Sequence, residues 1–189
     1  VSAPNRHRVL RAARDLGYLP TEGSVAMPSR PVALQFLIPN IENAFMRELA
    51  NSIEQFVEKQ PLVKSCKISV LKSIGSTEFI NALDGLSLET DGLGIIATDH
   101  PKTREAIRQV CEAGVRVVTL ASDVSSTPRS AYVGVNNRVA GRTAAQIMAM
   151  QIKDCSGTIA VFCGSRAFHG HQEREAGFVS YMAEHEPEL

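Results

Sequence analysis

The residues best suited to chemistry lie in short polar segments that follow apolar runs. Segment 164–174 holds two histidines, His169 and His171, and two arginines, Arg166 and Arg174. A metal site or an activated nucleophile would need a third ligand or a base beside the histidines, and none is near in the sequence. The glycine patterns that hold nucleotide phosphates are also absent from the sequence. We therefore predict no catalytic residue, no metal and no cofactor.

Other polar segments suit the binding of a hydroxylated molecule. Segment 39–46 carries Asn43 and the ring of Phe45, and segment 98–101 carries Asp99. Carboxylates and amides exchange hydrogen bonds with neighbouring hydroxyls, and a phenylalanine ring covers the apolar face of a sugar. Both residue types also have structural interpretations. Asp99 is placed to cap a helix that starts at residue 101, and Phe45 has the spacing of a core residue.

These polar segments alternate with stretches that have strand or helix periodicity. The strand-like runs are 32–38, 66–71, 94–97, 115–120, 130–135 and 158–163, and the helix-like stretches are 44–59, 76–86, 101–113, 138–152 and 171–185. Such alternation predicts an α/β fold with a doubly wound parallel sheet. In open sheets of this kind ligands bind at the carboxyl ends of the strands, which is where the polar segments lie.

The composition is that of an ordinary globular protein. The 189 residues include 20 Lys+Arg and 20 Asp+Glu, so the formal net charge is zero, and 44% are hydrophobic. These values argue against disorder and against a nucleic-acid footprint over the chain as a whole. Without a signal-peptide pattern or a long apolar window, we expect a cytoplasmic location. The four cysteines have no metal-like or redox spacing, which favours reduced thiols.

The two ends of the chain differ from its middle. Residues 1–20 have the spacing of a short basic helix, and residues 21–31 are typical of a linker, so we place a domain boundary there. After residue 157 only one strand and one helix are predicted, and one strand cannot bury its own edges. Either this segment joins the first sheet or it begins a second lobe that is incomplete here.

Three segments together resemble the LacI/GalR family of bacterial transcriptional repressors. The stretch that ends Leu-Gly-Tyr-Leu-Pro20 is similar to the last helix of the family's DNA-binding headpiece. Residues 132–145 resemble the entry to its second lobe, and residues 159–178 resemble the strand, glycine loop and Arg-x-x-Gly-Phe that follow. The resemblance implies a headpiece, a hinge and a two-lobed core like that of periplasmic sugar-binding proteins. It divides the chain into a headpiece remnant (1–20), a hinge (21–31), a first lobe (32–135) and the start of an incomplete second lobe (136–189).

The resemblance also implies a ligand site between the lobes. By position, its contacts with a monosaccharide or polyol would come from Asn43, Phe45, Asp99, Asn136 and Arg174. Asn136 stands where many relatives have aspartate, so that contact loses a charge. The implied protein is a homodimeric repressor on a pseudo-palindromic operator, controlled by an effector that favours one lobe arrangement over another. The helix that reads bases is missing from this sequence, so this chain alone should not bind an operator specifically.

Two other functions stay open from the sequence. A sugar-binding transport receptor would share the core without a role on DNA, although the basic segment 1–20 speaks against it. An α/β enzyme acting on sugars would need a base and a nucleophile that converge in the same crevice. A pairing of His169 or His171 with Asp99 or Asp123 would be such a set.

Overall fold

The computed structural model describes residues 30–39, 44–73, 75–152 and 157–185. The chain divides into two compact units, Val1–Pro31 and Val32–Leu189, and every element described below belongs to the second. The predicted helix at 1–20 and most of the linker at 21–31 lie outside the described residues. The division of the second unit into lobes at residue 136 stays a prediction.

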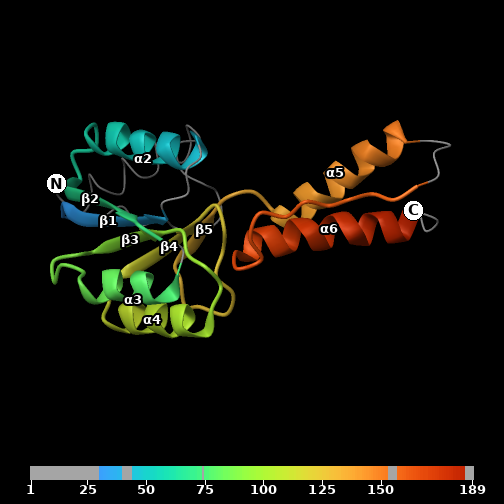
Figure 1. Cartoon of the computed structure of the whole chain (residues 1–189). Helices are drawn as coiled ribbons and strands as arrows, with labels where there is room; N and C mark the ends of the chain where they lie inside the picture. The colour runs from blue at the N-terminus through green and yellow to red at the C-terminus, as the bar shows by residue number, and fades with distance from the viewer. Residues whose placement is uncertain (1–29, 40–43, 74, 153–156, 186–189) are drawn as a thin grey trace, which may run out of the picture. The chain divides into compact units, whose positions relative to one another are not determined.

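Five parallel strands form one sheet in the order β2-β1-β3-β4-β5 (Figure 1). The strands are β1 (Val32–Pro39), β2 (Val63–Leu71), β3 (Gly92–Ile95), β4 (Arg116–Leu120) and β5 (Ala131–Val133). Leu37 of β1 pairs with Ile95 of β3, which pairs with Thr119 of β4, so the carboxyl ends of these three strands meet at one edge. The predicted α/β fold with a parallel sheet is confirmed.

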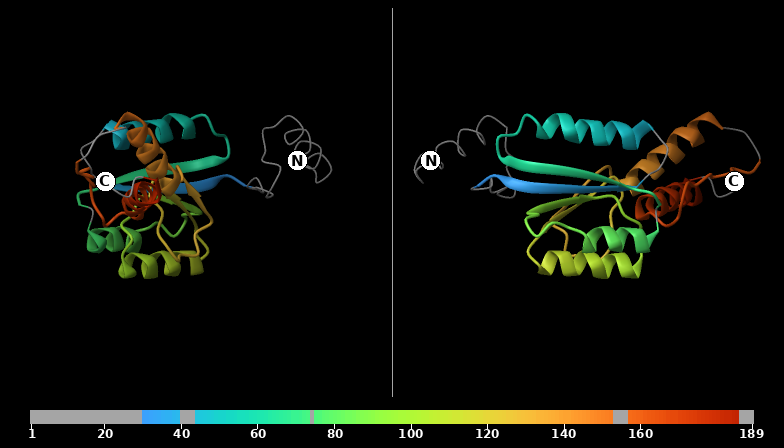
Figure 2. Two further views of the ribbon diagram at one scale, coloured as in Figure 1. Left: turned by 90° about the vertical axis from the view of Figure 1, so that its right-hand side faces the viewer. Right: turned by 60° about the vertical axis from the view of Figure 1, so that its left-hand side comes forward.

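Helices cover both faces of this sheet (Figures 1 and 2). The helices are α2 (Ala44–Val57), α3 (Ser76–Asp84), α4 (Pro101–Glu112), α5 (Asn137–Gln151) and α6 (His169–His185). Phe79 of α3 and Ile107 of α4 are buried against Leu37, Ile95 and Val117 on one face. On the other face, α2 packs through its apolar stripe. Because both faces are covered, the central strands are almost continuous apolar runs.

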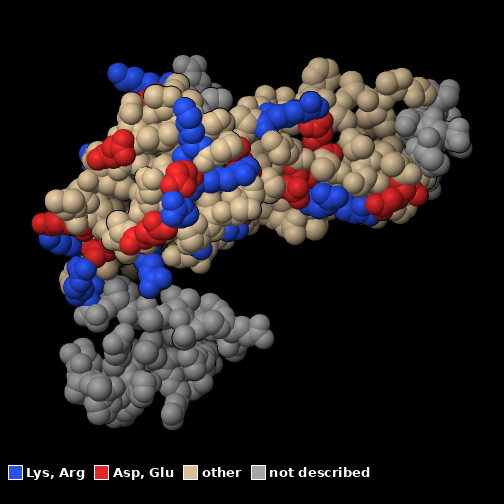
Figure 3. Space-filling view, turned by 90° about the horizontal axis from the view of Figure 1, so that it is seen from below, with Lys and Arg blue, Asp and Glu red and all other residues tan. Residues whose placement is uncertain are grey.

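The outer surface of α4 carries charges of both signs. Arg108 forms ion pairs with Glu105 and Glu112, one turn away on either side. Figure 3 shows acidic and basic side chains interspersed over the described part of the face seen from below. Exposed pairs of this kind add little stability. They keep the surface polar, in line with the zero net charge of the sequence.

Helices α5 and α6 lie side by side and cross at two glycines (Figure 1). A Cβ atom on Gly141 would lie 2.0 Å from the carbonyl oxygen of Arg174, and one on Gly177 would lie 2.1 Å from that of Arg138. Only residues without a side chain permit this approach of the two backbones. The crossing therefore fixes the position of Arg174 relative to α5.

The strand predicted at 158–163 is wrong, because no strand forms there. A strand needs a neighbour to pair its backbone groups, and none of the described residues supplies one. The side chain of Phe162 is 95% exposed in this stretch. The other predicted elements are present with ends shifted by a few residues, which is the usual uncertainty of such boundaries.

Candidate functional site

A groove of about 730 Å³ opens at the carboxyl ends of the strands, where α2, the sheet and the start of α6 meet. This volume is in the range of small-molecule sites. Helix α2, the ends of β3, β4 and β5, and residues 164–174 all contribute to its walls. The lining residues are Phe45, Met46, Leu49, Ile96, Leu120, Ala121, Ser122, Val133, Gly134, Val135, Gly164, Phe168, His171 and Arg174.

Arg174 is held in the groove wall by a buried amide. Its Nε donates to Oδ1 of Asn137 at 2.6 Å, and Nδ2 of Asn137 donates to the Tyr132 hydroxyl at 3.1 Å. Burial raises the pKa of Tyr132, so its hydroxyl stays neutral. Among the described residues no carboxylate lies within ion-pairing distance of Arg174. The guanidinium is thus oriented by an amide and keeps donors available to a ligand.

The segment before α6 is attached directly to the sheet. Phe168 is 4% exposed and packs against Ile38 and Ile96. The backbone nitrogen of Asp99 donates to the Ala167 carbonyl at 2.8 Å, and that of Gly170 donates to Ser122 Oγ at 3.0 Å. These contacts hold the helix that carries Arg174 against the strand ends.

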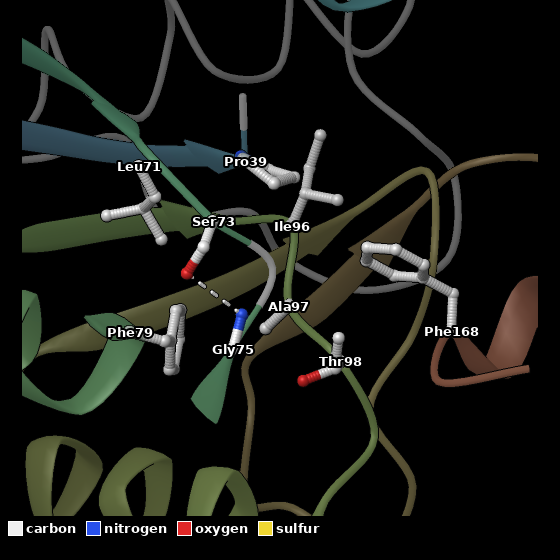
Figure 4. A pocket seen from close by; sticks show the side chains of 9 residues that line it. All are labelled: Pro39, Leu71, Ser73, Gly75, Phe79, Ile96, Ala97, Thr98 and Phe168. Carbon is white, nitrogen blue, oxygen red and sulfur yellow. Dashed lines mark hydrogen bonds between the residues drawn. The ribbon is translucent and has the colours of Figure 1, made fainter. Parts of the chain in front are cut away.

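A second, much smaller cavity lies beside Phe168 (Figure 4). Its other walls come from the ends of β1, β2 and β3 and from α3, and Ser73 Oγ accepts a hydrogen bond from the Gly75 nitrogen at 3.3 Å there. The cavity volume of about 10 Å³ leaves room for about one water molecule. This cavity is therefore too small for an organic ligand.

Asp99 lies outside the groove lining and is occupied by protein partners. Its side chain is 5% exposed; it accepts from Arg104 Nε at 2.6 Å and from the Ser125 hydroxyl, and His169 Nδ1 lies 3.8 Å away. Burial alone would raise the pKa of this carboxyl, but the hydrogen bonds from Arg104 and Ser125 outweigh it and the pKa is lowered. The helix cap expected from Asp99 is made instead by His100, whose Nδ1 accepts from the Lys102 nitrogen.

The lowered pKa of Asp99 gives a pH-dependent stability. A carboxyl with a depressed folded-state pKa stabilises the fold above its unfolded pKa, and this contribution is lost as the pH falls through the folded value. We expect urea unfolding below about pH 4 to show a weaker pH dependence in Asp99→Asn than in the unchanged protein. The exposed Asp84→Asn is the matched control and should keep the original dependence. Equal pH dependence in all three proteins would contradict the assigned role of Asp99.

The structure brings together two of the five predicted ligand residues. Phe45 and Arg174 both line the groove. Asn43 lies outside the described residues. Asn136 is exposed and caps α5, with Oδ1 accepting from the Val139 nitrogen at 3.1 Å. A ligand contact by Asn43, Asp99 or Asn136 therefore stays a prediction.

The histidines and Asp123 do not form one cluster. His171 lines the groove with Nδ1 2.9 Å from the Ser165 carbonyl oxygen, whereas His169 lies beside Asp99. Asp123 accepts from Thr119 and pairs with Arg129. Within the described ranges no three His, Cys, Asp or Glu side chains gather as metal ligands.

Two residues at the site were missed by sequence reasoning. The sequence pointed to Asn136 rather than to its neighbour Asn137, and Ser122 has the pattern of a turn former. Their positions immediately after strand-like runs, at the predicted ligand edge, were the available signal. Of the two adjacent asparagines, Asn137 is the buried one. Ser122 connects the groove wall to α6 because its Oγ accepts from the Gly170 nitrogen.

A family model described as a periplasmic binding protein domain matches residues 32–189. The chain belongs to the periplasmic binding protein family. The predicted likeness of the core to periplasmic binding proteins is therefore confirmed. Among proteins of curated function, none matches the sequence. No helix in the described part of the chain has the length and apolar character needed to cross a membrane.

Several solved structures share the fold of this periplasmic-binding-protein domain. GanP, a glucose-galactose binding protein from Geobacillus stearothermophilus, is 21% identical with a TM-score of 0.73 over 84% of this chain and 56% of its own. A solute binding protein of an ABC transporter from Burkholderia graminis, in complex with D-arabinose, is 21% identical with a TM-score of 0.74 over 85% and 54%.

A protein described as a LacI transcriptional regulator, from Bacteroides fragilis, is 19% identical with a TM-score of 0.69 over 84% of this chain and 57% of its own. The chain thus spans little more than half the length of these structures. At these identities the similarity shows the fold alone.

Proposed function

We propose that this periplasmic-binding-protein domain is the sensor of a transcriptional regulator and binds a small sugar-like effector in the groove. The observation that carries the proposal is the presence of Phe45 and Arg174 in the walls of one groove. They come from α2 and α6, which belong to the predicted first and second lobes. A ligand that touches both helices favours the arrangement in which they are close.

Regulation of DNA binding is supported by the resemblance of segment 1–20 to a headpiece helix. In the proposed mechanism, the effector changes the affinity of a homodimer for its operator only through its different affinities for two lobe arrangements. Such a regulator acts on DNA in the cytoplasm. The family resemblance implies that it is a repressor, and its action includes no catalytic step. Ligand contacts by Asn43, Asp99 and Asn136, implied by the resemblance, remain part of the proposal.

A sugar-binding transport receptor is the second candidate. It is favoured by the similarity to GanP and to the arabinose-bound solute binding protein. Both candidates need the groove, but only the regulator needs DNA. Binding to DNA therefore separates them.

The groove is tested by a thermal-shift screen of monosaccharides, polyols and purines on the intact protein. A ligand at 100 times its dissociation constant should stabilise the protein by about 2.7 kcal/mol. Arg174→Ala should abolish the shift, whereas Arg116→Ala, at the amino end of β4 and outside the lining, should preserve it. A stabilising ligand whose effect survives Arg174→Ala would show that the groove is not the site.

The regulatory role is tested with the ligand found in that screen. Genomic fragments that bind the full-length protein containing this chain are selected, and their affinity is measured with and without the ligand. The proposal expects a change of roughly 5-fold to 150-fold, in either direction. Failure of the ligand-bound and ligand-free protein to select any DNA would favour the transport receptor.

A further inference from the structure

The walls of the groove are chemically uneven. Of the fourteen described residues that line the groove, eight are large and apolar, and none is Asp, Glu, Asn or Gln. The polar side chains of the described lining are Ser122, His171 and Arg174. A neutral sugar presents several hydroxyl protons, each of which needs an acceptor once it is removed from water.

Several acceptors in these walls already have partners. Ser122 Oγ accepts from the Gly170 nitrogen, and Nδ1 of His171 is engaged with the backbone of Ser165. The carbonyl oxygens of Ala121 and Val135 lie 3.1 Å and 2.9 Å from the Tyr132 hydroxyl. A ligand rich in hydroxyl donors would therefore find few acceptors in the described walls.

The two glutamates next to Arg174 in the sequence of α6 lie close to other arginines. Glu175 pairs with Arg166, and Glu173 lies 3.8 Å from Arg138. Arg174 itself is bonded to the neutral amide of Asn137. A guanidinium that has no carboxylate partner among the described residues, beside apolar walls, favours an acceptor-rich group of opposite charge.

We infer that the groove takes a small organic anion whose carboxylate or phosphate binds Arg174 and whose apolar face lies against Phe45 and Phe168. This inference rests on the proposed function and narrows its small effector to one that carries an acidic group. Phe45 on α2 and Phe168 before α6 both line the groove and give it aromatic surface, most of it from the exposed ring of Phe45. Carboxylate and phosphate share the chemistry that a guanidinium recognises in two parallel hydrogen bonds.

The test is isothermal titration of the intact protein with matched neutral and acidic probes. The pairs are galactose with galacturonate, glucose with glucose 6-phosphate, and benzyl alcohol with benzoate. We expect the acid to bind roughly 10-fold to 100-fold more tightly than its neutral partner in at least one pair, as for a hydrogen bond to a charged group. The pair that responds identifies a carboxylate or a phosphate as the bound group.

Variants at two arginines test whether the preference for the acid depends on Arg174. Arg174→Gln should reduce the preference for the acid to less than about 3-fold, and Arg174→Lys should keep part of it because the charge remains. Arg116→Gln removes an equal charge at the amino end of β4, outside the groove lining, and should leave the preference unchanged. Circular dichroism spectra establish that each variant is folded.

Three results would overturn the inference. If a neutral probe binds as tightly as its acid, and its binding requires Arg174, the groove binds ligands but the anion is wrong, and the proposed function stands. The inference that Arg174 binds an anionic group is also wrong if the preference for the acid survives Arg174→Gln. If none of the six probes binds, the anion inference is overturned, whereas the proposed function is decided separately by the wider ligand screen.

Discussion

Replacement of Phe168 by alanine is expected to lower the free energy of unfolding by about 3–5 kcal/mol. The ring is 4% exposed and fills the space between Ile38, Ile96 and the α2 side of the sheet. Its removal leaves a cavity that neighbouring strands cannot close, because they are held in register. It also frees the segment that carries α6, so ligand affinity should fall together with stability.

Urea unfolding of the intact protein measures this effect. Phe56→Ala is the matched control, because the ring of Phe56 on α2 is 64% exposed and its removal should change stability by less than about 0.5 kcal/mol. A loss below about 1 kcal/mol for Phe168→Ala would show that the segment before α6 is not anchored by this ring.

Replacement of Gly141 by alanine should destabilise the protein by about 1–3 kcal/mol, although alanine is the better helix former. The added methyl group would lie 2.0 Å from the carbonyl oxygen of Arg174, which is backbone and cannot rotate away. The two helices must then separate. Because Arg174 is displaced with α6, ligand binding should weaken as well.

The sign of the stability change in Gly141→Ala shows whether steric conflict or helix propensity is the larger contribution. In the exposed part of α5, Ala144→Gly should cost about 1 kcal/mol, which measures helix propensity alone in the same helix. If Gly141→Ala instead stabilises the protein by a similar amount, propensity exceeds steric conflict and the close crossing of α5 and α6 is wrong. Thermal and urea unfolding of the three proteins provide the comparison.

The sheet was predictable because hydrophobic periodicity reports local structure. The runs at 32–38 and 115–120 became β1 and β4, and turn residues marked their ends. The run at 158–163 is also apolar but forms no strand, because a strand depends on a pairing partner as well as on its own residues. Periodicity alone does not contain that information.

The site was predictable at the level of loops and less so at the level of side chains. The carboxyl-end rule pointed to the loops beside the groove, and the family resemblance pointed to Phe45 and Arg174, which lie in its walls. The resemblance could not distinguish Asn136 from Asn137, because the helix start decides which of two adjacent amides is buried. Nor could it foresee that Arg104 and Ser125 occupy Asp99, since these partners are brought together only by the fold.

The most direct test of the account is a crystal structure of the intact protein with the ligand that stabilises it most. The account predicts ligand density in the groove, with an acidic group on the Arg174 guanidinium and the ligand body against the Phe45 ring. Density at any other place, with this groove unfilled and Arg174 still bonded only to Asn137, would contradict it.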